Sequence, residues 1–221
     1  MSDLAGFRDR RDAGGRLAER LAPYRGACEA VVLALSRGGV AVGFEVASRI
    51  GAALDVLVVR ELGVPGHSGL TMGAIASGGL RVVDQRVAEL FGVSNDAIAA
   101  IEARERTALE RGDRAYHARR APVALGGRTA ILVDDGIETV GAMSAAIDAV
   151  RTCGPARTIA AVPVASREIC EALGDHADDM ICLRTPELLR ALDAWYDDFA
   201  PLTDRQVCQL LDAAGHGDAA P

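Results

Sequence analysis

The sequence lacks an excess of basic residues, and this lack bears on its partners. Its 24 lysines and arginines are outnumbered by 31 aspartates and glutamates, which gives a formal net charge of −7. A protein that grips nucleic acid in general needs a basic face to neutralise phosphates. We therefore expect no nucleic-acid partner.

The sequence also lacks paired cysteine motifs and long apolar runs. Its five cysteines are odd in number and none stands in C-x-x-C spacing, so neither a disulfide framework nor a thiolate metal site is indicated. No apolar run approaches the roughly 18 residues that span a bilayer, and the charged first dozen residues contain no signal-peptide core. These absences favour a cytoplasmic protein with no membrane partner.

One stretch, Thr129 to Ser144, has the pattern of a ligand site. The apolar strand pattern of 130–133 ends in Asp134 and Asp135, and a short loop leads into a predicted helix, 139–153. Ligands gather where parallel strands end, and a helix N-terminus attracts anions. A phosphate could lie on the loop, while the two carboxylates accept sugar hydroxyls and hold Mg²⁺, directly or through water. Alternatively, the aspartates are solvated turn residues that cap a helix.

A second strand, turn and helix come earlier in the chain. The apolar run 29–35 predicts a buried strand, which is followed by Ser36, Arg37 and two glycines and then by a predicted helix, 40–50. The glycines would let the backbone approach an anion, and Arg37 offers a bidentate fork to phosphate. The alternative is a tight turn without a ligand.

The remaining pattern predicts an α/β protein. Its expected elements are helix 4–22, strand 54–60, a hairpin of 73–77 and 80–84, helix 94–117, strands 156–165 and 179–183, and a last helix with a capping box at Thr203 and Gln206. The arginines of 4–22 are interpreted as a solvated face. The irregular segment 61–79, which contains His67, is expected to be a lid or binding loop. This order predicts a parallel sheet with helices on both faces and an inserted flexible loop and hairpin.

Three stretches together resemble the type I phosphoribosyltransferase family. VDDGIETVGAM is similar to the loop that binds 5-phosphoribosyl 1-pyrophosphate (PRPP), and LSRGGVAVGFEVA to the pyrophosphate loop. VVRELGVPGHSGLTMGAIASGG and WYDDF resemble a bacterial subgroup whose substrates are mostly unassigned. The resemblance implies one domain over 1–221, with an N-terminal helix in 1–25, a Rossmann-like core in 28–183 and a small C-terminal hood and helix in 184–221.

The resemblance also implies a reaction and a set of site residues. With Mg²⁺ as cofactor, a phosphoribosyl group would pass from PRPP to a nitrogen acceptor, such as a nucleobase, and pyrophosphate would leave. Loop 61–72 would close over the reacting centre. The implied catalytic residues are Arg37, Asp135 and Glu138, and the implied metal ligands are Asp134 and Asp135. The implied substrate-binding residues are Ser36, Arg37, Gly38, Gly39, Arg60, His67, Asp134, Asp135, Gly136, Ile137, Glu138, Thr139, Val140, Gly141, Ala142 and Trp195.

Five residues depart from the family pattern and leave alternatives open, among them Gly69, which stands where an acidic residue is usual, and Asp193, which stands where a glycine of the hood is usual. Val140 and Ala142 stand where the family has glycine and threonine, and Glu61 stands where the subgroup commonly has lysine. The chain could therefore be a non-catalytic protein that binds a nucleotide or phosphosugar. It could also be a diverged transferase or hydrolase that needs no 5′-phosphate cradle.

Two side chains and the oligomeric state have alternative interpretations as well. Glu138 could act as a base toward the acceptor, or could simply lie in the first turn of a helix. Trp195 could stack on a base, or could belong to the core. By analogy with the family we expect a homodimer, with helix 94–117 as a candidate interface.

Overall fold

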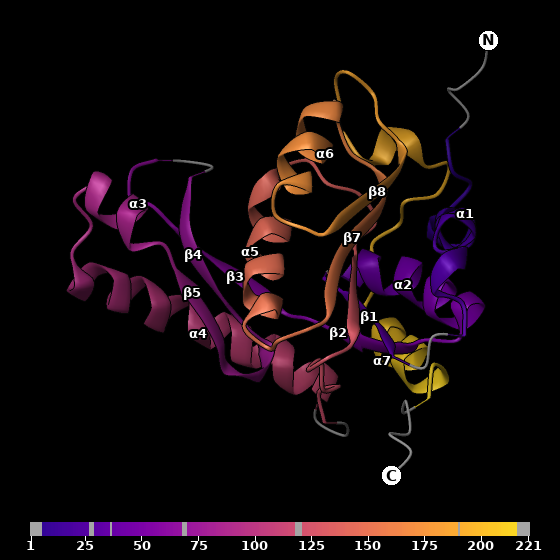
Figure 1. Ribbon diagram of the computed structural model, residues 1–221, viewed down its shortest axis with the longest axis horizontal. Helices are drawn as coiled ribbons and strands as arrows, with labels where there is room; N and C mark the ends of the chain where they lie inside the picture. The colour runs from indigo at the N-terminus through magenta and orange to yellow at the C-terminus, as the bar shows by residue number, and fades with distance from the viewer. Residues whose placement is uncertain are drawn as a thin grey trace.

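The main sheet of the protein has five parallel strands in the order β2-β1-β6-β7-β8 (Figure 1). The computed structural model describes residues 6–26, 29–35, 37–67, 70–117, 121–189 and 191–215. The strands are β1 (Ala30–Ala34), β2 (Ala53–Val56), β6 (Thr129–Val133), β7 (Arg157–Val164) and β8 (Asp179–Arg184). Val32 lies opposite Ile131 in the register of β1 and β6. The predicted parallel sheet is confirmed.

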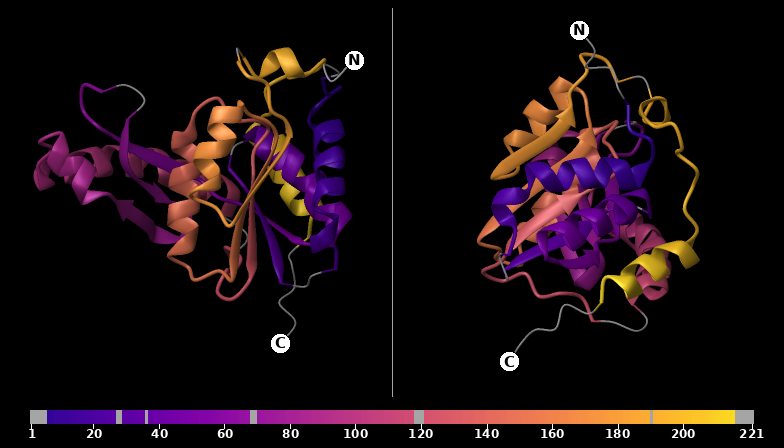
Figure 2. Two further views of the ribbon diagram at one scale, coloured as in Figure 1. Left: turned by 45° about the horizontal axis from the view of Figure 1, so that its top comes forward. Right: turned by 90° about the vertical axis from the view of Figure 1, so that its right-hand side faces the viewer.

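Helices cover both faces of this sheet (Figure 2). The helices on one face are α1 (Arg10–Arg20), α2 (Arg37–Ile50) and α7 (Asp204–Ala213), and those on the other are α5 (Val140–Arg151) and α6 (Arg167–Gly174). Successive residues of a strand point to opposite faces. Val32 therefore packs in the first core, and its neighbours Val31 and Leu33 in the second.

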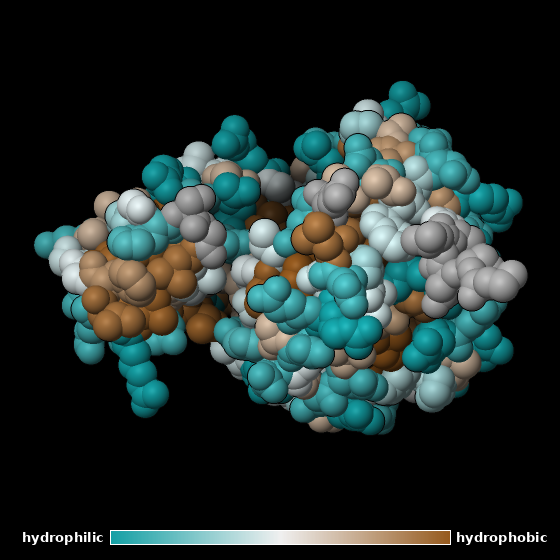
Figure 3. Space-filling view, turned by 90° about the horizontal axis from the view of Figure 1, so that it is seen from above, coloured by the Kyte–Doolittle hydropathy of each residue, from teal (hydrophilic) through white to brown (hydrophobic). Residues whose placement is uncertain are grey.

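A second, antiparallel sheet forms a lobe that projects from the main body (Figure 1). It consists of β3 (Val59–Gly63), β4 (Thr71–Ala76) and β5 (Leu80–Val83), with α3 (Gln85–Leu90) and α4 (Asn95–His117) packed beside it. The predicted hairpin is confirmed as β4 and β5, whereas α3 was not predicted. Figure 3 shows that the molecule narrows between lobe and body, and that hydrophobic residues gather on the lobe.

The predicted single strand 54–60 is wrong. The chain leaves β2 after Val56 and begins β3 at Val59 in the other sheet. Ser77 causes the change of partner, because its hydroxyl accepts the Val58 N–H at 3.0 Å and its own N–H donates to the Val58 carbonyl at 2.9 Å. Residues 61–63 consequently belong to β3 and not to a closing loop.

The start of α2 also differs from the prediction. The helix begins at Arg37, so that Arg37, Gly38 and Gly39 form its first turn instead of a loop. Ser36 lies outside the described residues. Glycine has a low helix propensity, and here tertiary packing overrides it.

A short segment near the C-terminus joins the N-terminal part of the chain. The Phe7 N–H donates to the Trp195 carbonyl at 2.7 Å, and the Asp197 N–H donates back to the Phe7 carbonyl at 2.9 Å. The predicted capping box of Thr203 and Gln206 is confirmed at the start of α7. Short 3-10 helices are η1 (Ala22–Tyr24), η2 (Ser77–Gly79) and η3 (Asp193–Trp195). Across the described residues, no helix, the 23-residue α4 included, is long and apolar enough to cross a membrane.

Candidate functional site

The order of strands reverses between β1 and β6. From β1 the chain continues to β2 on one side, and from β6 to β7 and β8 on the other. The helices that follow, α2 and α5, pack on opposite faces of the sheet. Such a reversal opens a crevice beyond the carboxyl ends of the strands, where ligands of open α/β sheets bind. The segments beginning at Arg37 and at Asp134 both lie at this edge.

Gly38 and Gly39 pack the first turn of α2 against the acidic pair. A Cβ atom on Gly38 would overlap the Asp135 carboxylate, and one on Gly39 would lie 2.9 Å from Asp134 Oδ1 and from the Val133 carbonyl oxygen. Any larger residue would push the helix away from the end of β6. The close packing of α2 therefore explains both glycines and the early start of this helix.

The Asp135 carboxylate forms an ion pair with Arg10. Arg10 Nε donates to Asp135 Oδ2 at 2.7 Å, and the two side chains are only 12% and 11% exposed. The guanidinium of Arg10 lies 3.8 Å from the ring centroid of Phe199 and donates to the Ala200 carbonyl at 2.9 Å. The Tyr196 hydroxyl donates to the backbone carbonyl of Asp135. Arg10 is thus held in place from several sides.

Arg10 is the site residue that sequence reasoning missed. The arginines of the N-terminal helix were expected to form a solvated face, and Arg8 and Arg11 do remain largely exposed. A signal for Arg10 was present, because residues 7, 10, 14, 17 and 21 share one helical face. Phe7, Leu17 and Leu21 on that face are fully buried. An arginine in such a row predicts a buried ion pair.

Asp134 is the better candidate for contact with a metal ion. It is partly buried, and its Oδ1 accepts the N–H of Asp135 at 2.9 Å, while Arg10 engages the Asp135 carboxylate. Within the part of the chain that the structure describes, no three His, Cys, Asp or Glu side chains are grouped to hold a metal ion. Mg²⁺ usually takes one or two carboxylates and completes its shell with water and substrate phosphates. The residues present fit that mode.

Arg37 points away from the acidic pair. Its Nε donates to Asp204 Oδ1 at 2.7 Å, and the Tyr116 hydroxyl donates to the same oxygen at 2.7 Å. These hydrogen bonds, that of Tyr116 first, hold the pKa of Asp204 below its ordinary value. The Arg37 side chain is 58% exposed, so it can turn without breaking a core contact.

Arg60 and Glu61 point to opposite faces of β3. Arg60 Nη2 donates to Glu105 Oε2 on α4 at 2.8 Å, and this bond holds the pKa of Glu105 below its ordinary value. Glu61 instead faces α5, where a Cβ atom on Gly141 would lie 2.7 Å from Glu61 Oε2. Of these two residues, only Glu61 lies against the first turn of α5.

Residues 136–142 connect β6 to the first turn of α5. Gly136 has a φ of 155°, and a Cβ atom there would overlap the Leu192 side chain. Ile137 is buried and its N–H donates to the Val164 carbonyl at 3.0 Å.

The residues around the start of α5 include two exposed side chains, Glu138 and Thr139. Glu138 Oε1 accepts the Leu192 N–H at 3.2 Å. The exposed Thr139 is the N-cap of α5 but makes no side-chain capping bond, so its hydroxyl can serve a ligand. Val140 and Ala142 flank Gly141 in the first turn.

His67 and Trp195 lie on different parts of the molecule. His67 lines a cavity of about 540 Å³ together with Glu61, Arg104 and Ile101, and its ring meets Phe91 edge to face at 4.7 Å. Trp195 packs partly buried on a hydrophobic cluster that includes Phe7 and Tyr196. His67 therefore lines the same cavity as Glu61, whereas Trp195 packs with other residues of the hood.

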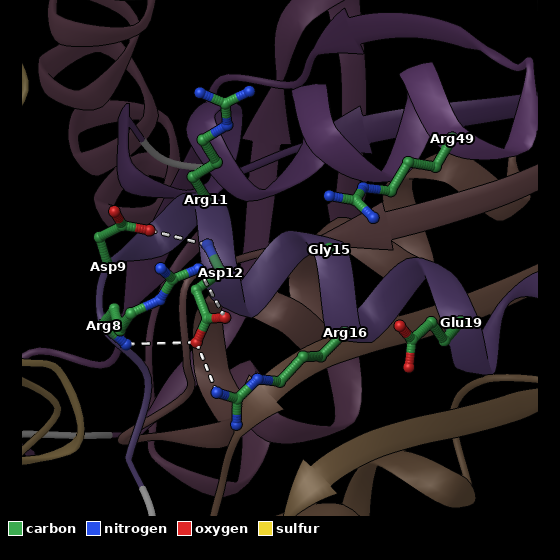
Figure 4. Close-up of a pocket in the computed structure, with 8 residues that line it drawn as sticks. All are labelled: Arg8, Asp9, Arg11, Asp12, Gly15, Arg16, Glu19 and Arg49. Carbon is green, nitrogen blue, oxygen red and sulfur yellow. Dashed lines mark hydrogen bonds and ion pairs between the residues drawn. The ribbon is translucent and has the colours of Figure 1, made fainter.

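A second hollow lies beside α1 and is lined by charged side chains, several of which form ion pairs (Figure 4). It has a volume of about 380 Å³ and is lined by Arg8, Asp9, Arg11, Asp12, Gly15, Arg16, Glu19 and Arg49. Arg16 pairs with Asp12 at 2.8 Å and Arg11 with Glu45 at 2.9 Å. These carboxylates offset the arginines, which agrees with the predicted solvated face.

Comparisons with known proteins identify the family to which the chain is similar. A family model described as "Phosphoribosyl transferase domain" matches residues 70–187. Two Mycobacterium tuberculosis relatives, "Putative phosphoribosyl transferase MT0597" (strain CDC 1551 / Oshkosh) and "Putative phosphoribosyl transferase Rv0571c" (strain ATCC 25618 / H37Rv), are each 41% identical over 214 residues. The match covers 97% of this chain and 48% of each relative, so the chain spans about half the length of these curated relatives.

A solved structure is similar over nearly its whole length. The crystal structure of TT1426 from Thermus thermophilus is 40% identical in sequence and has a TM-score of 0.83. The match covers 93% of this chain and 97% of that chain. With the acidic pair at the reversal of strand order and the matching family model, the chain belongs to the phosphoribosyl transferase domain family.

Proposed function

We propose that the protein transfers a phosphoribosyl group from PRPP to a nitrogen acceptor. One observation carries the proposal, namely that Asp134 and Asp135 stand at the end of β6, beside the reversal of strand order and just before the N-terminus of α5. In the reaction, the bond from the anomeric carbon to the pyrophosphate oxygen breaks. A bond to the acceptor nitrogen forms, and the acceptor loses its proton.

The proposed roles follow the positions of the side chains. Asp134 and the free oxygen of Asp135 would accept hydrogen bonds from the ribose hydroxyls, and Arg10 would keep Asp135 in position. The first turn of α5 would hold the 5′-phosphate, because unpaired N–H groups and the helix dipole favour anions there. Catalysis of this kind depends on positioning and on neutralising the charge of the leaving group.

The pyrophosphate would lie against the first turn of α2. Arg37, Gly38 and Gly39 are the residues proposed to hold it, and Arg37 would leave Asp204 to do so. Mg²⁺, held by Asp134 through water and by the substrate's own oxygens, would neutralise part of the charge that develops on pyrophosphate. Glu138 would take the acceptor proton after releasing the Leu192 N–H.

We propose that the N-terminal helix, the core and the hood act as one domain. Arg10 from α1 and Tyr196 from the hood both bond to Asp135, which supports this division of roles. We also propose a homodimer, as expected from the family. Exposed Leu90 and Phe91, 78% and 37% accessible, lie on the lobe that carries α4, the expected interface. Sedimentation equilibrium would determine the mass.

The experiment that tests the transfer uses the purified chain with PRPP, Mg²⁺ and a panel of nucleobases. Release of pyrophosphate with at least one acceptor is expected, and Asp134→Asn should reduce it by about 100-fold or more, since a positioned carboxylate is lost. No release with any acceptor, together with no PRPP binding by calorimetry, would contradict the proposal.

A second candidate function is binding without catalysis. The observation in its favour is that Arg37 is paired with Asp204 while the Glu61 carboxylate lies against the phosphate loop. A binding protein would take up PRPP or a nucleotide in calorimetry and release no pyrophosphate. Restoring the family pattern with Val140→Gly and Ala142→Thr would then raise PRPP affinity.

A further inference from the structure

Two residues that depart from the family pattern are in contact with each other. Glu61 has replaced the usual lysine on β3, and Gly141 stands one position later than the glycine of the family loop. The carboxylate of Glu61 lies directly against Gly141, since a Cβ atom there would be 2.7 Å from Oε2, 2.9 Å from Cδ and 2.9 Å from Oε1. Any larger residue at this position would displace the carboxylate from where it lies.

The register of the lobe explains why Glu61 reaches α5. Glu61 pairs with Ala74 on β4, and their side chains share the face of the lobe that packs on α5. Ala74 and Ala76 on this face are small and buried, so the lobe approaches the helix closely. Glu61 is the charged residue on this face of β3, and it is directed at the first turn of α5.

Among the described residues, the Glu61 carboxylate has no cation of its own. It forms no hydrogen bond or ion pair with any of them, although Arg60 and Arg104 are nearby on the lobe and both pair with Glu105. A carboxylate at a helix N-terminus is stabilised by the dipole and by unpaired N–H groups. The Thr139 side chain does not cap this helix, which leaves the turn to another acceptor.

We infer that Glu61 is a specificity-determining residue that competes with the phosphate of the ligand for the first turn of α5. The inference rests on the proposed function, in which this turn holds the sugar 5′-phosphate. Two anions on one helical turn repel each other, so a 5′-phosphorylated sugar binds only when the Glu61 side chain is displaced. The wild-type loop therefore binds sugar phosphates more weakly than it would without the Glu61 charge.

The test measures binding of ribose 5-phosphate, a probe that cannot release pyrophosphate. Calorimetry compares the wild-type chain with Glu61→Gln, which keeps size and removes charge. Glu89→Gln is the matched control, because Glu89 is an exposed glutamate on α3 of the same lobe. Glu61→Gln should bind the probe about tenfold more tightly or better, since a like charge near the phosphate is removed, and Glu89→Gln should match the wild type.

A second variant tests the contact itself. In Gly141→Ala, the methyl group would occupy the space of the Glu61 carboxylate, so adding Glu61→Gln to this background should improve affinity by less than it does in the wild type. Equal affinity of wild type and Glu61→Gln, or no detectable binding by either, would overturn the inference. The transfer reaction is judged separately by pyrophosphate release, so it can fail while the tenfold gain remains.

Discussion

Arg10 pairs with Asp135 at the centre of the proposed site, although it lies 125 residues away in the chain. Its ion pair with Asp135 is almost wholly buried, so removing the guanidinium would leave an unpaired buried carboxylate. We expect Arg10→Met to lower the free energy of unfolding by about 3 kcal/mol.

Urea denaturation with Arg11→Met as control would measure this effect. Arg11 is the next residue of α1, and its side chain is 81% exposed in its ion pair with Glu45. The control should therefore change stability by about 1 kcal/mol at most. Equal losses from the two substitutions would show that Arg10 has no special role.

Gly38 provides a second prediction at the scale of single residues. In Gly38→Ala the new methyl group would overlap Asp135, so we expect α2 to shift, with a loss of about 2 kcal/mol or more and weaker PRPP binding. Gly174→Ala, at the end of α6, is the matched control because no heavy atom lies within 4 Å of its added Cβ. Thermal unfolding would compare the two variants, and a stable Gly38→Ala that binds PRPP would refute the expectation.

The sequence could predict where the acidic pair of the proposed site lies among the elements better than it could predict the partners of its residues. Asp134 and Asp135 were identified from the strand before them, and the family resemblance is confirmed. The pairing of Asp135 with Arg10, of Arg37 with Asp204 and of Glu61 with Gly141 could not be predicted. Each joins residues far apart in the chain, so it depends on how helices and sheets pack and not on local spacing.

Among the elements, α4 ends in a buried cluster from which we expect a pH-dependent stability. Its last residue, His117, meets Asp55 of β2 at 3.1 Å and Asp113 at 2.8 Å through its two ring nitrogens. Carboxylates only accept hydrogen bonds, so this geometry favours the doubly protonated ring. Burial lowers the pKa of His117, but these two partners outweigh burial and raise the pKa above its ordinary value.

The raised pKa fixes the direction of the pH dependence. The stabilisation is fully present below the unfolded pKa of about 6.5 and is lost as the pH rises through the higher folded pKa. Above pH 6.5 we expect the free energy of unfolding to fall by up to about 1.4 kcal/mol per pH unit until the folded pKa is passed.

Urea denaturation from pH 5.5 to 9 would measure this decline. His117→Asn should abolish it, whereas His176→Asn should keep it, because His176 is 43% exposed and lies 3.6 Å from Asp148. A decline that persists in His117→Asn would contradict the assignment.

Prediction of the elements succeeded where a pattern was continuous and failed where the chain changed partners. The apolar runs of β1, β6 and β7 and the long helix α4 agree with the sequence. The prediction of one strand over 54–60 failed because the apolar pattern continues through Leu57 and Val58. At Val58 the backbone bonds to Ser77 and the chain enters the second sheet. The prediction missed the first turn of α2 because glycine has a low helix propensity. The packing of this turn against Asp134 and Asp135 explains why it is helical.

At the scale of the whole molecule, the lobe and the main body have separate cores. Leu62, Ile75, Ile98 and Leu109 belong to the lobe cluster, while β1 and β6 are paired on both sides within the main sheet. We expect the lobe to open at a lower free energy than the body. Amides of β5, an edge strand, should then exchange with deuterium well before those of β1 and β6, and equal rates would show a single cooperative unit.

The hood residues Tyr196 and Phe199, which contact Asp135 and Arg10, have a consequence for synthesis of the chain on the ribosome. Arg10 emerges first and Asp135 much later, yet the aromatic ring that covers their ion pair, Phe199, is translated after both. A nascent chain that has just completed β7 therefore has an acidic pair without its cover. The site can be completed only after the hood has emerged from the ribosome, so ligand binding should not begin before this segment is translated.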